Sequence, residues 1–268
     1  MKGAPAVLNG SSPWAARYAQ EVRRIVVEHA EHAPRSQQVH LGPSELGVEC
    51  DRQVVSKLLG LPKTNHVVDP WPSIVGTATH AWLAEAFDAW NRRHQATRFV
   101  TETRVVPHPD HSGTGDLYDA FEQAVVDHKV LGESSMAKIR SADGPPMRYR
   151  AQLHLYARGF KSLGLPVKRV VLVAYPRTAS SLDGLYVWEE EHDEKAEALV
   201  DAVLTRTQTR KDMAELVKRG LLTIEQVPTA PDADECFFCD FYRPEAARDG
   251  GPGCPGSRAK SETAIAIN

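Results

Sequence analysis

Two aspartates and a lysine stand close together near the middle of the chain. Residues 113–121 and 123–131 are rich in strand formers, which predicts a hairpin with its turn near Glu122 and Gln123. Asp116 lies on the first strand. Asp127 and Lys129 share one face of the second strand, because successive side chains of a strand point to opposite faces. We expect the hairpin to bring both carboxylates and the ammonium group to one edge of a sheet.

These three groups are suited to the hydrolysis of phosphodiester bonds. Mg²⁺ and Mn²⁺ prefer oxygen ligands such as carboxylates, and such an ion neutralises charge that develops on a phosphate. A lysine two residues after a ligating carboxylate can orient the attacking water or contact the scissile phosphate. The alternative is a surface hairpin whose aspartate and lysine form an ordinary cross-strand ion pair.

The chain has four cysteines, of which Cys236 and Cys239 form a C-x-x-C pair, Cys254 follows after a longer interval, and Cys50 lies far upstream. The first twenty residues lack the apolar stretch of a signal peptide, so we expect a cytoplasmic protein whose thiols stay reduced. Four clustered thiols are then candidate ligands for a 4Fe-4S cluster, which would use every cysteine. A tetrahedral zinc site remains open, as do free or disulfide-bonded cysteines.

Helices and strands alternate in the pattern of an α/β protein. Apolar periodicity predicts helices over residues 13–32, 45–59, 70–94, 147–163 and 193–219, the last beginning at an Asp cap. Strands are expected over 97–106, 167–175 and 185–188 in addition to the hairpin, with a loop or short helix over 134–146. Residues 228–255 show little periodicity, so an external constraint such as a metal group must order them. These elements predict a mixed central sheet flanked by helices.

The helix over 147–163 carries polar side chains next to its apolar stripe. Gln152 and Tyr156 are four residues apart and share a face that can point toward the carboxylates. Basic residues on the same helix are candidates for phosphate contacts: Arg148, Arg150, Arg158 and Lys161. Taken alone, Gln152 and Tyr156 fit an ordinary amphipathic boundary better than a site. For each basic residue, a solvated charged face is as good an explanation as a phosphate contact.

Taken in order, four motifs resemble the RecB-like nucleases of the PD-(D/E)xK superfamily, including the CRISPR-associated Cas-four family and the AddB nuclease domain. The matching segments are Gly76-Thr77-Ala78-Thr79-His80, Gly115-Asp116, Asp127-His128-Lys129 and Gln152-Leu153-His154-Leu155-Tyr156. The resemblance implies that His80, Asp116, Asp127 and the main-chain carbonyl of His128 bind the catalytic metal. It also implies that Lys129 is catalytic and that Gln152 and Tyr156 position the substrate.

The order of one cysteine followed by three also resembles the iron-sulfur members of these families, although the interval from Cys239 to Cys254 is longer than usual there. The resemblance covers Leu41 to Cys254 and implies a restriction-endonuclease-like core. We expect an N-terminal helical extension over 1–40, a nuclease domain with its cluster over 41–255 and a flexible tail over 256–268. The cluster would tie the N-terminal helical region to the C-terminal segment.

The resemblance implies a Mg²⁺- or Mn²⁺-dependent DNA exonuclease, 5′ to 3′ on single-stranded ends, with endonuclease activity left open. Because the net charge is −3, any DNA binding would depend on local basic patches. No segment is apolar over the length that a membrane span needs. No phosphate-binding loop motif is present, so unwinding would need a helicase or another recombination or CRISPR-adaptation partner. The rival hypotheses are a noncatalytic DNA-end-binding or assembly module and a metal-binding structural protein with accidental motifs.

Overall fold

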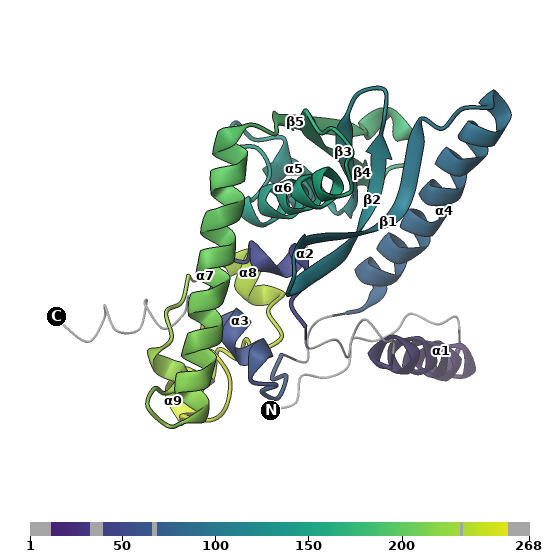
Figure 1. Cartoon of the computed structure of the whole chain (residues 1–268). Coiled ribbons are helices and arrows are strands. Elements are labelled where there is room, and N and C mark those ends of the chain that lie inside the picture. Colours follow the sequence, from purple (N-terminus) through teal and green to yellow (C-terminus); the bar gives the residue numbers. More distant parts are fainter. Residues whose placement is uncertain (1–11, 33–39, 66–68, 231–232, 257–268) are drawn as a thin grey trace. The chain divides into compact units, whose positions relative to one another are not determined.

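The computed structural model describes residues 12–32, 40–65, 69–230 and 233–256 (Figure 1). These residues belong to two compact units. The first unit holds α1 (Pro13–Glu31) together with residues 69–74, and the second holds the rest of the described chain. Helix α1 begins at the Ser12 cap, which accepts a hydrogen bond from the backbone of Ala15, and it has an exposed apolar face of Trp14, Tyr18, Val22, Ile25 and Val26.

A five-stranded mixed sheet forms the centre of the second unit, in the order β1-β2-β3-β4-β5. The strands are β1 (Phe99–His108), β2 (His111–Asp119), β3 (Ala124–Leu131), β4 (Arg169–Pro176) and β5 (Tyr186–Glu191). All neighbouring pairs are antiparallel except β3 and β4, which are parallel. A parallel pair needs a long crossover, and here the chain crosses through α5 (Glu133–Ile139) and α6 (Met147–Ser162).

Helix α6 supplies the core of this unit by packing against the sheet. Leu153 and Phe160 are fully buried against Val105, Val125 and Leu172 of the strands. Helix α7 (Glu194–Lys218) packs in turn against α6, together with the short helices α2 (Pro43–Leu46) and α3 (Asp51–Leu58). Within the described residues, the other helical elements are η2 (Leu182–Gly184), η3 (Ile224–Gln226), α8 (Ala233–Phe237) and α9 (Ala246–Asp249).

Helix α4 (Trp71–His94) lies along β1 through its residues from Val75 onward (Figure 1). Phe87 and Trp90 make edge contacts with Phe99, and Asp88 accepts a hydrogen bond from the hydroxyl of Thr101. Among the described helices none is long and apolar enough to cross a membrane.

The predicted mixed α/β sheet with flanking helices is confirmed, and the long helices, including the Asp193 cap of α7, lie within a residue or two of their predicted bounds. The single helix predicted over 45–59 is wrong, because the chain breaks between α2 and α3. A Cβ at Gly47 would lie 2.7 Å from that of Ala151, and the carbonyls of Leu46 and Val48 accept hydrogen bonds from the buried Arg210. Tertiary contacts therefore override the local helical pattern.

Candidate active site and cysteine pocket

The candidate site lies where β2 separates from β3. The antiparallel ladder between these strands runs only from Asp119↔Ala124 to Leu117↔Val126, and β3 continues beyond it paired with β4 alone. In this fork the backbone N–H of His128 donates to Oδ2 of Asp116 over 2.8 Å instead of to a strand carbonyl. The N–H and C=O of one strand residue point to the same side, so the carbonyl of His128 also faces the fork.

Asp127 and Lys129 lie on the face of β3 that is covered by α6, as their spacing predicts. The ammonium of Lys129 is 2.7 Å from Oδ2 of Asp127, and Gln152 links the pair by donating to Oδ1 of Asp127 over 2.9 Å and accepting from Lys129 over 3.2 Å. Both oxygens of Asp127 are therefore held, Oδ1 by the amide of Gln152 and Oδ2 by the ammonium of Lys129.

The two aspartates are in opposite electrostatic situations. Burial raises the pKa of Asp127 to about 6, and the charge of Asp116 acts in the same direction while Lys129 opposes it. Burial also acts to raise the pKa of Asp116, but the hydrogen bond and charge of His80 outweigh it and hold that pKa below its ordinary value. The site therefore concentrates carboxylate charge that one lysine does not fully offset.

His80 of α4 and Glu102 of β1 complete a group of three candidate metal ligands with Asp116. One ligand atom from each of these residues lies within 4.8 Å of the other two, and Nδ1 of His80 is 3.3 Å from Oδ2 of Asp116. By strand register Glu102 stands opposite Asp116, between the pairs Thr101↔Leu117 and Thr103↔Gly115. The hydrogen bond with Asp116 raises the pKa of His80, so in the metal-free protein this histidine acts as a partner of the carboxylate.

Glu102 is the site residue that sequence reasoning missed. It carries a φ of 43°, in the left-handed region that non-glycine residues avoid, although it lies within a strand. Its place opposite Asp116 depends on the register between β1 and β2. The only sequence signal is an acidic residue inside a run of strand formers, and this is too common to select it.

The side chain of His128 points away from the aspartates. Its ring is buried, stacks on Phe87 with centroids 5.6 Å apart, and lies 3.3 Å by its Nδ1 from the hydroxyl of Tyr175. Burial lowers its pKa to about 4, which keeps the imidazole neutral. The ring also lies edge-on to that of His80, with centroids 6.2 Å apart, and the main-chain N–H of His128 is the group that contacts Asp116.

Close packing holds the residues that lie next to Asp116 and Gln152. A Cβ at Gly115 would lie 2.6 Å from the ring of Phe160, so the residue before Asp116 must be glycine for β2 to approach α6. Tyr156 is buried in the core, and its hydroxyl lies 3.5 Å from Nε2 of Gln152. The structure thus brings Gln152 to the carboxylates directly, and Tyr156 contacts Gln152.

The basic residues of α6 are engaged with carboxylates of neighbouring segments. Arg148 pairs with Glu235, and Arg150 pairs with Glu190. Arg158 and Lys161 both contact Glu197 of α7. These ion pairs favour a structural role for the four residues over the phosphate contacts considered from the sequence.

The four cysteines line one pocket between the N-terminal helices and the C-terminal segment. Cys50 caps α3 and Cys236 lies in α8, while Cys239 is buried. Burial raises the pKa of the Cys239 thiol to about 12, and the neighbouring cysteines add to the effect. A ligand that carries positive charge would stabilise the thiolates that this pocket disfavours.

The long interval between Cys239 and Cys254 folds back on itself. Tyr242 pairs with Cys254 in a parallel bridge, the N–H of Cys254 donates to the carbonyl of Phe241 over 2.7 Å, and Arg243 forms an ion pair with Asp249. Hydrogen bonds also join this segment to the N-terminal region: Asn65 donates to the carbonyls of Phe237 and Cys239. The insertion therefore returns Cys254 to the pocket despite its length.

No protein-family model and no curated protein matches this chain. Similar solved structures include the alkaline exonuclease LHK-Exo from Laribacter hongkongensis, with 14% identity over 70% of this chain and 95% of that chain and a TM-score of 0.44. SSO0001 has 16% identity over 84% of this chain and 94% of its own, with a TM-score of 0.44. A phage-related exonuclease from Haemophilus somnus 129PT has 10% identity over 80% of this chain and 91% of that chain, with a TM-score of 0.33. The likeness is a distant one in overall fold, and the RecB-like relationship stays a prediction.

Proposed function

We propose that this protein is a metal-dependent deoxyribonuclease that hydrolyses phosphodiester bonds at the fork of β2 and β3. The observation that carries the proposal is the convergence of Asp116, Asp127 and Lys129 with His80, from α4 and two adjacent strands. An ordinary cross-strand ion pair would need only one carboxylate and the lysine. Here a second carboxylate is close by, and Gln152 contacts both Asp127 and Lys129.

The donor set fits a hard divalent cation. The ligand atoms of His80, Glu102 and Asp116 lie within 4.8 Å of one another, and the carboxylate of Asp127 is buried next to them beside Lys129. Mg²⁺ or Mn²⁺ would be held by these four side chains and the carbonyl of His128. When bound, the ion supplies positive charge against the phosphate and lowers the pKa of water.

Lys129 is the group that acts on the substrate. Its ammonium, kept protonated by the two aspartates despite burial, donates to a phosphate oxygen and opposes the negative charge that develops during attack. Gln152 holds the amine in place and orients Asp127, and Tyr156 supports Gln152 from the core side. These contacts fix the site geometry before the substrate arrives.

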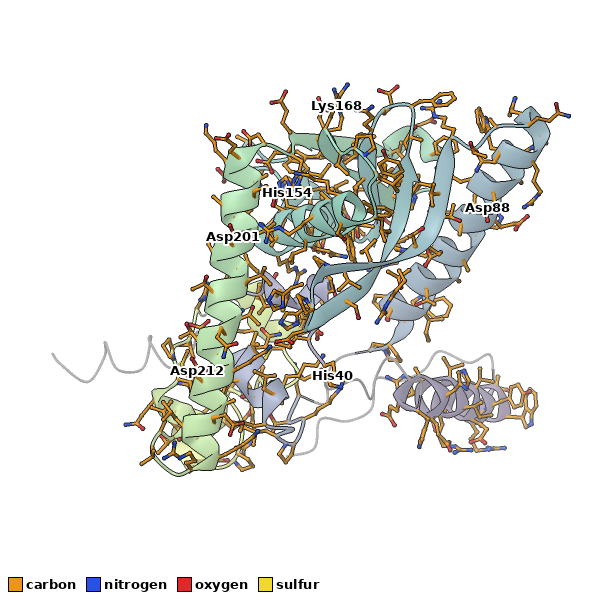
Figure 2. All side chains as sticks on the ribbon, in the orientation of Figure 1. His40, Asp88, His154, Lys168, Asp201 and Asp212 are labelled. Atoms are coloured by element: carbon orange, nitrogen blue, oxygen red, sulfur yellow. The ribbon has the colours of Figure 1, made fainter. Side chains whose placement is uncertain are left out.

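The motif resemblance supports the finer assignment: exonuclease action on single-stranded ends in the 5′ to 3′ direction. The test is degradation of single-stranded DNA labelled separately at either end, with Mn²⁺ or Mg²⁺. Wild type is compared with Asp116→Asn and Lys129→Met. The matched controls are Asp212→Asn on α7 and Lys168→Met just before the start of β4, both exposed (Figure 2).

We expect metal-dependent shortening by wild type and both controls, and a loss of about 100-fold or more in the two site variants. Release of label first from the 5′ end would support the direction. Binding of DNA ends without cleavage by folded, metal-loaded wild type would contradict the nuclease and favour the noncatalytic end-binding module.

The cysteine pocket is proposed to hold a 4Fe-4S cluster with a structural role. Support comes from the four cysteines lining one pocket at the junction of two chain segments that are distant in sequence. Anaerobic purification should give a brown protein with broad visible absorption and about four irons per chain. A colourless protein with one zinc per chain would replace the cluster with a tetrahedral zinc site.

A further inference from the structure

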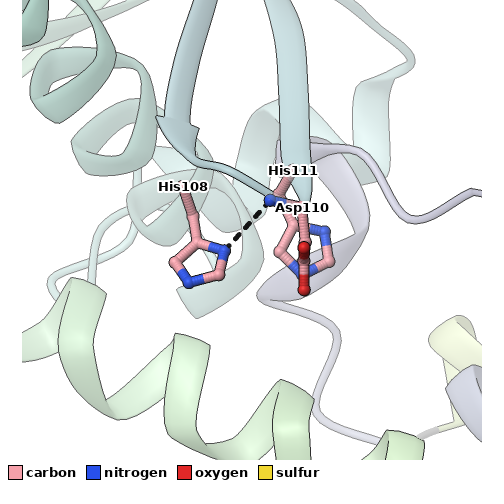
Figure 3. A group of neighbouring side chains, drawn as sticks. All are labelled: His108, Asp110 and His111. Atoms are coloured by element: carbon pink, nitrogen blue, oxygen red, sulfur yellow. Dashed lines mark hydrogen bonds between the residues drawn. The ribbon is translucent and has the colours of Figure 1, made fainter.

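The turn between β1 and β2 carries a second cluster of metal-ligating side chains. His108 ends β1, His111 begins β2 as its cross-strand partner, and Asp110 lies between them in the turn (Figure 3). One ligand atom of each residue lies within 4.8 Å of the other two. Six residues of extended chain, about 20 Å, separate His108 from Glu102, so this cluster is distinct from the carboxylate site.

His111 is held in the orientation typical of a metal ligand. It is 4% exposed, and its Nδ1 lies 3.0 Å from the carbonyl of Leu41, to which only a protonated Nδ1 can donate. This contact leaves the lone pair on Nε2 free to bind a cation. Metal-binding histidines commonly donate their other ring N–H to a carbonyl or carboxylate in this way. Nδ1 of His108 accepts the N–H of Asp110 over 3.3 Å, and this long contact must break when the lone pair of the neutral ring binds a cation.

We propose that His108, Asp110 and His111 bind Zn²⁺ and so fasten the β1–β2 turn. Two imidazoles and one carboxylate form a donor set that favours zinc over the all-oxygen environment chosen by Mg²⁺. Three protein ligands leave a fourth position for water. Through His111 and Leu41 the ion would also secure the segment that leads into α2.

Lys211 of α7 competes with the ion for Asp110. Its ammonium lies 2.8 Å from Oδ2 of Asp110 and neutralises that carboxylate when no cation is bound. Zinc binding must displace this ammonium, so removing it should strengthen binding. Because this ion pair is exposed and therefore weak, Lys211→Met should bind Zn²⁺ only about two- to fivefold more tightly.

The test is to titrate Zn²⁺ into the whole chain, with the metal group bound in its cysteine pocket and with Mg²⁺ in excess. Calorimetry measures the affinity for Zn²⁺, and thermal unfolding measures the rise in Tm that Zn²⁺ causes. His108→Asn and Asp110→Asn are the test variants. His94→Asn, at the exposed end of α4, is the control. We expect wild type to bind one Zn²⁺ at this site. Its affinity should fall by about 10-fold or more in each test variant, stay unchanged in His94→Asn and rise in Lys211→Met.

Substitution of Co²⁺ for Zn²⁺ separates this site from the cysteines. The expected spectrum has weak visible bands without thiolate charge-transfer absorption, and His108→Asn removes those bands. A wild type that binds no Zn²⁺ under these conditions would overturn the proposal. Binding that is unaffected by His108→Asn and Asp110→Asn, or equally weakened by His94→Asn, would overturn it as well.

Discussion

At the scale of single residues, Glu102 combines an unfavourable backbone conformation with a position beside Asp116 and His80. A non-glycine residue in the left-handed region costs on the order of 1–2 kcal/mol. The neighbouring pairs of the β1–β2 ladder hold it there, and its carboxylate is thereby directed toward the proposed metal site. Strain of this kind is concentrated at functional sites.

The strain predicts an inverted order of stability between two substitutions. At ordinary strand positions glycine is less stable than alanine by about 0.5–1 kcal/mol. At position 102 we expect Glu102→Gly to be more stable than Glu102→Ala by about 1 kcal/mol, because glycine adopts the positive φ without cost. Chemical denaturation of the metal-free proteins measures this difference, and Thr103 serves as the reference position with an ordinary φ. The usual order at both positions would rule out strain at Glu102.

Sequence reasoning identified the residues whose placement depends on local periodicity. Alternation along β3 was enough to place Asp127 and Lys129 together, and helical spacing placed Gln152 beside Tyr156. It missed Glu102 because its position depends on strand register, and it left Arg158 and Lys161 undecided because Glu197, their partner, comes from another helix. Long-range contacts of this kind have no signature within a short segment.

At the scale of elements, Arg210 of α7 holds the break between α2 and α3. Its side chain is fully buried, pairs with Asp51 over 2.7 Å and donates to the carbonyls of Leu46 and Val48. These bonds satisfy backbone groups that a continuous helix would have used. They also fix the segment that presents Cys50 to the cysteine pocket.

Removal of this arginine should be costly, whereas removal of its exposed neighbour should not. Arg210→Ala leaves the carbonyls of Leu46 and Val48 without their buried donor and leaves Asp51 paired with Arg206 alone, and we expect a loss of about 3–5 kcal/mol in the free energy of unfolding. Arg206 pairs with the same oxygen of Asp51, but its side chain is 46% exposed. Arg206→Ala should cost about 1 kcal/mol or less in the same urea titration. Equal losses would show that the buried position of Arg210 is unimportant.

The contact between α6 and α7 predicts how stability changes in acid. Burial acts to raise the pKa of Glu197, but hydrogen bonds from Lys161 and Arg158 outweigh it and lower the pKa from 4.5 to about 2. Because the native pKa is the lower one, the stabilisation is complete above pH 4.5 and is lost as the pH falls from there toward 2.

Glu197→Gln should therefore be less stable than wild type at neutral pH by about 1 kcal/mol, after allowance for the exposure of these groups, and the difference should shrink below pH 4.5. Urea denaturation from pH 7 to pH 3 measures it. Asp201→Asn is the matched control, since Asp201 also pairs with Arg158 but its side chain is 70% exposed (Figure 2). A wild-type advantage that stays constant with pH would contradict the assignment.

At the scale of the whole molecule, the cysteine pocket joins distant parts of the chain. Cys50 comes from the N-terminal helices, and the other three come from a C-terminal segment with little regular structure. The sequence predicted the need for an external constraint on this segment. It could not predict the folded interval before Cys254, because the bridge to Tyr242 pairs residues in an irregular loop.

Loss of the proposed metal group should destabilise this junction more than the sheet. A group that is present at about 100 times its Kd stabilises the folded protein by about 2.7 kcal/mol. Its loss corresponds to a fall in Tm of about 5–11 °C for a domain of this size. We expect this fall in Cys239→Ser, with faster proteolysis within residues 233–256. Gln53→Ala, which alters the pocket lining without removing a sulfur, should change neither. An unchanged Tm in Cys239→Ser would indicate that the pocket binds no stabilising group.

The same separation along the chain sets an order of events during protein synthesis. Every residue of the proposed catalytic group up to Lys129 leaves the ribosome before Cys236, which follows 107 residues later. At typical elongation rates this interval lasts roughly 5–20 s. Cys50 must wait through that interval as a lone thiol, so a nascent chain carries its carboxylates before it can accept a cluster. Insertion of the proposed cluster is then a late maturation step, and for such a cluster we expect cells short of iron to accumulate chains whose hairpin has folded and whose C-terminal segment is not yet held by the cysteines.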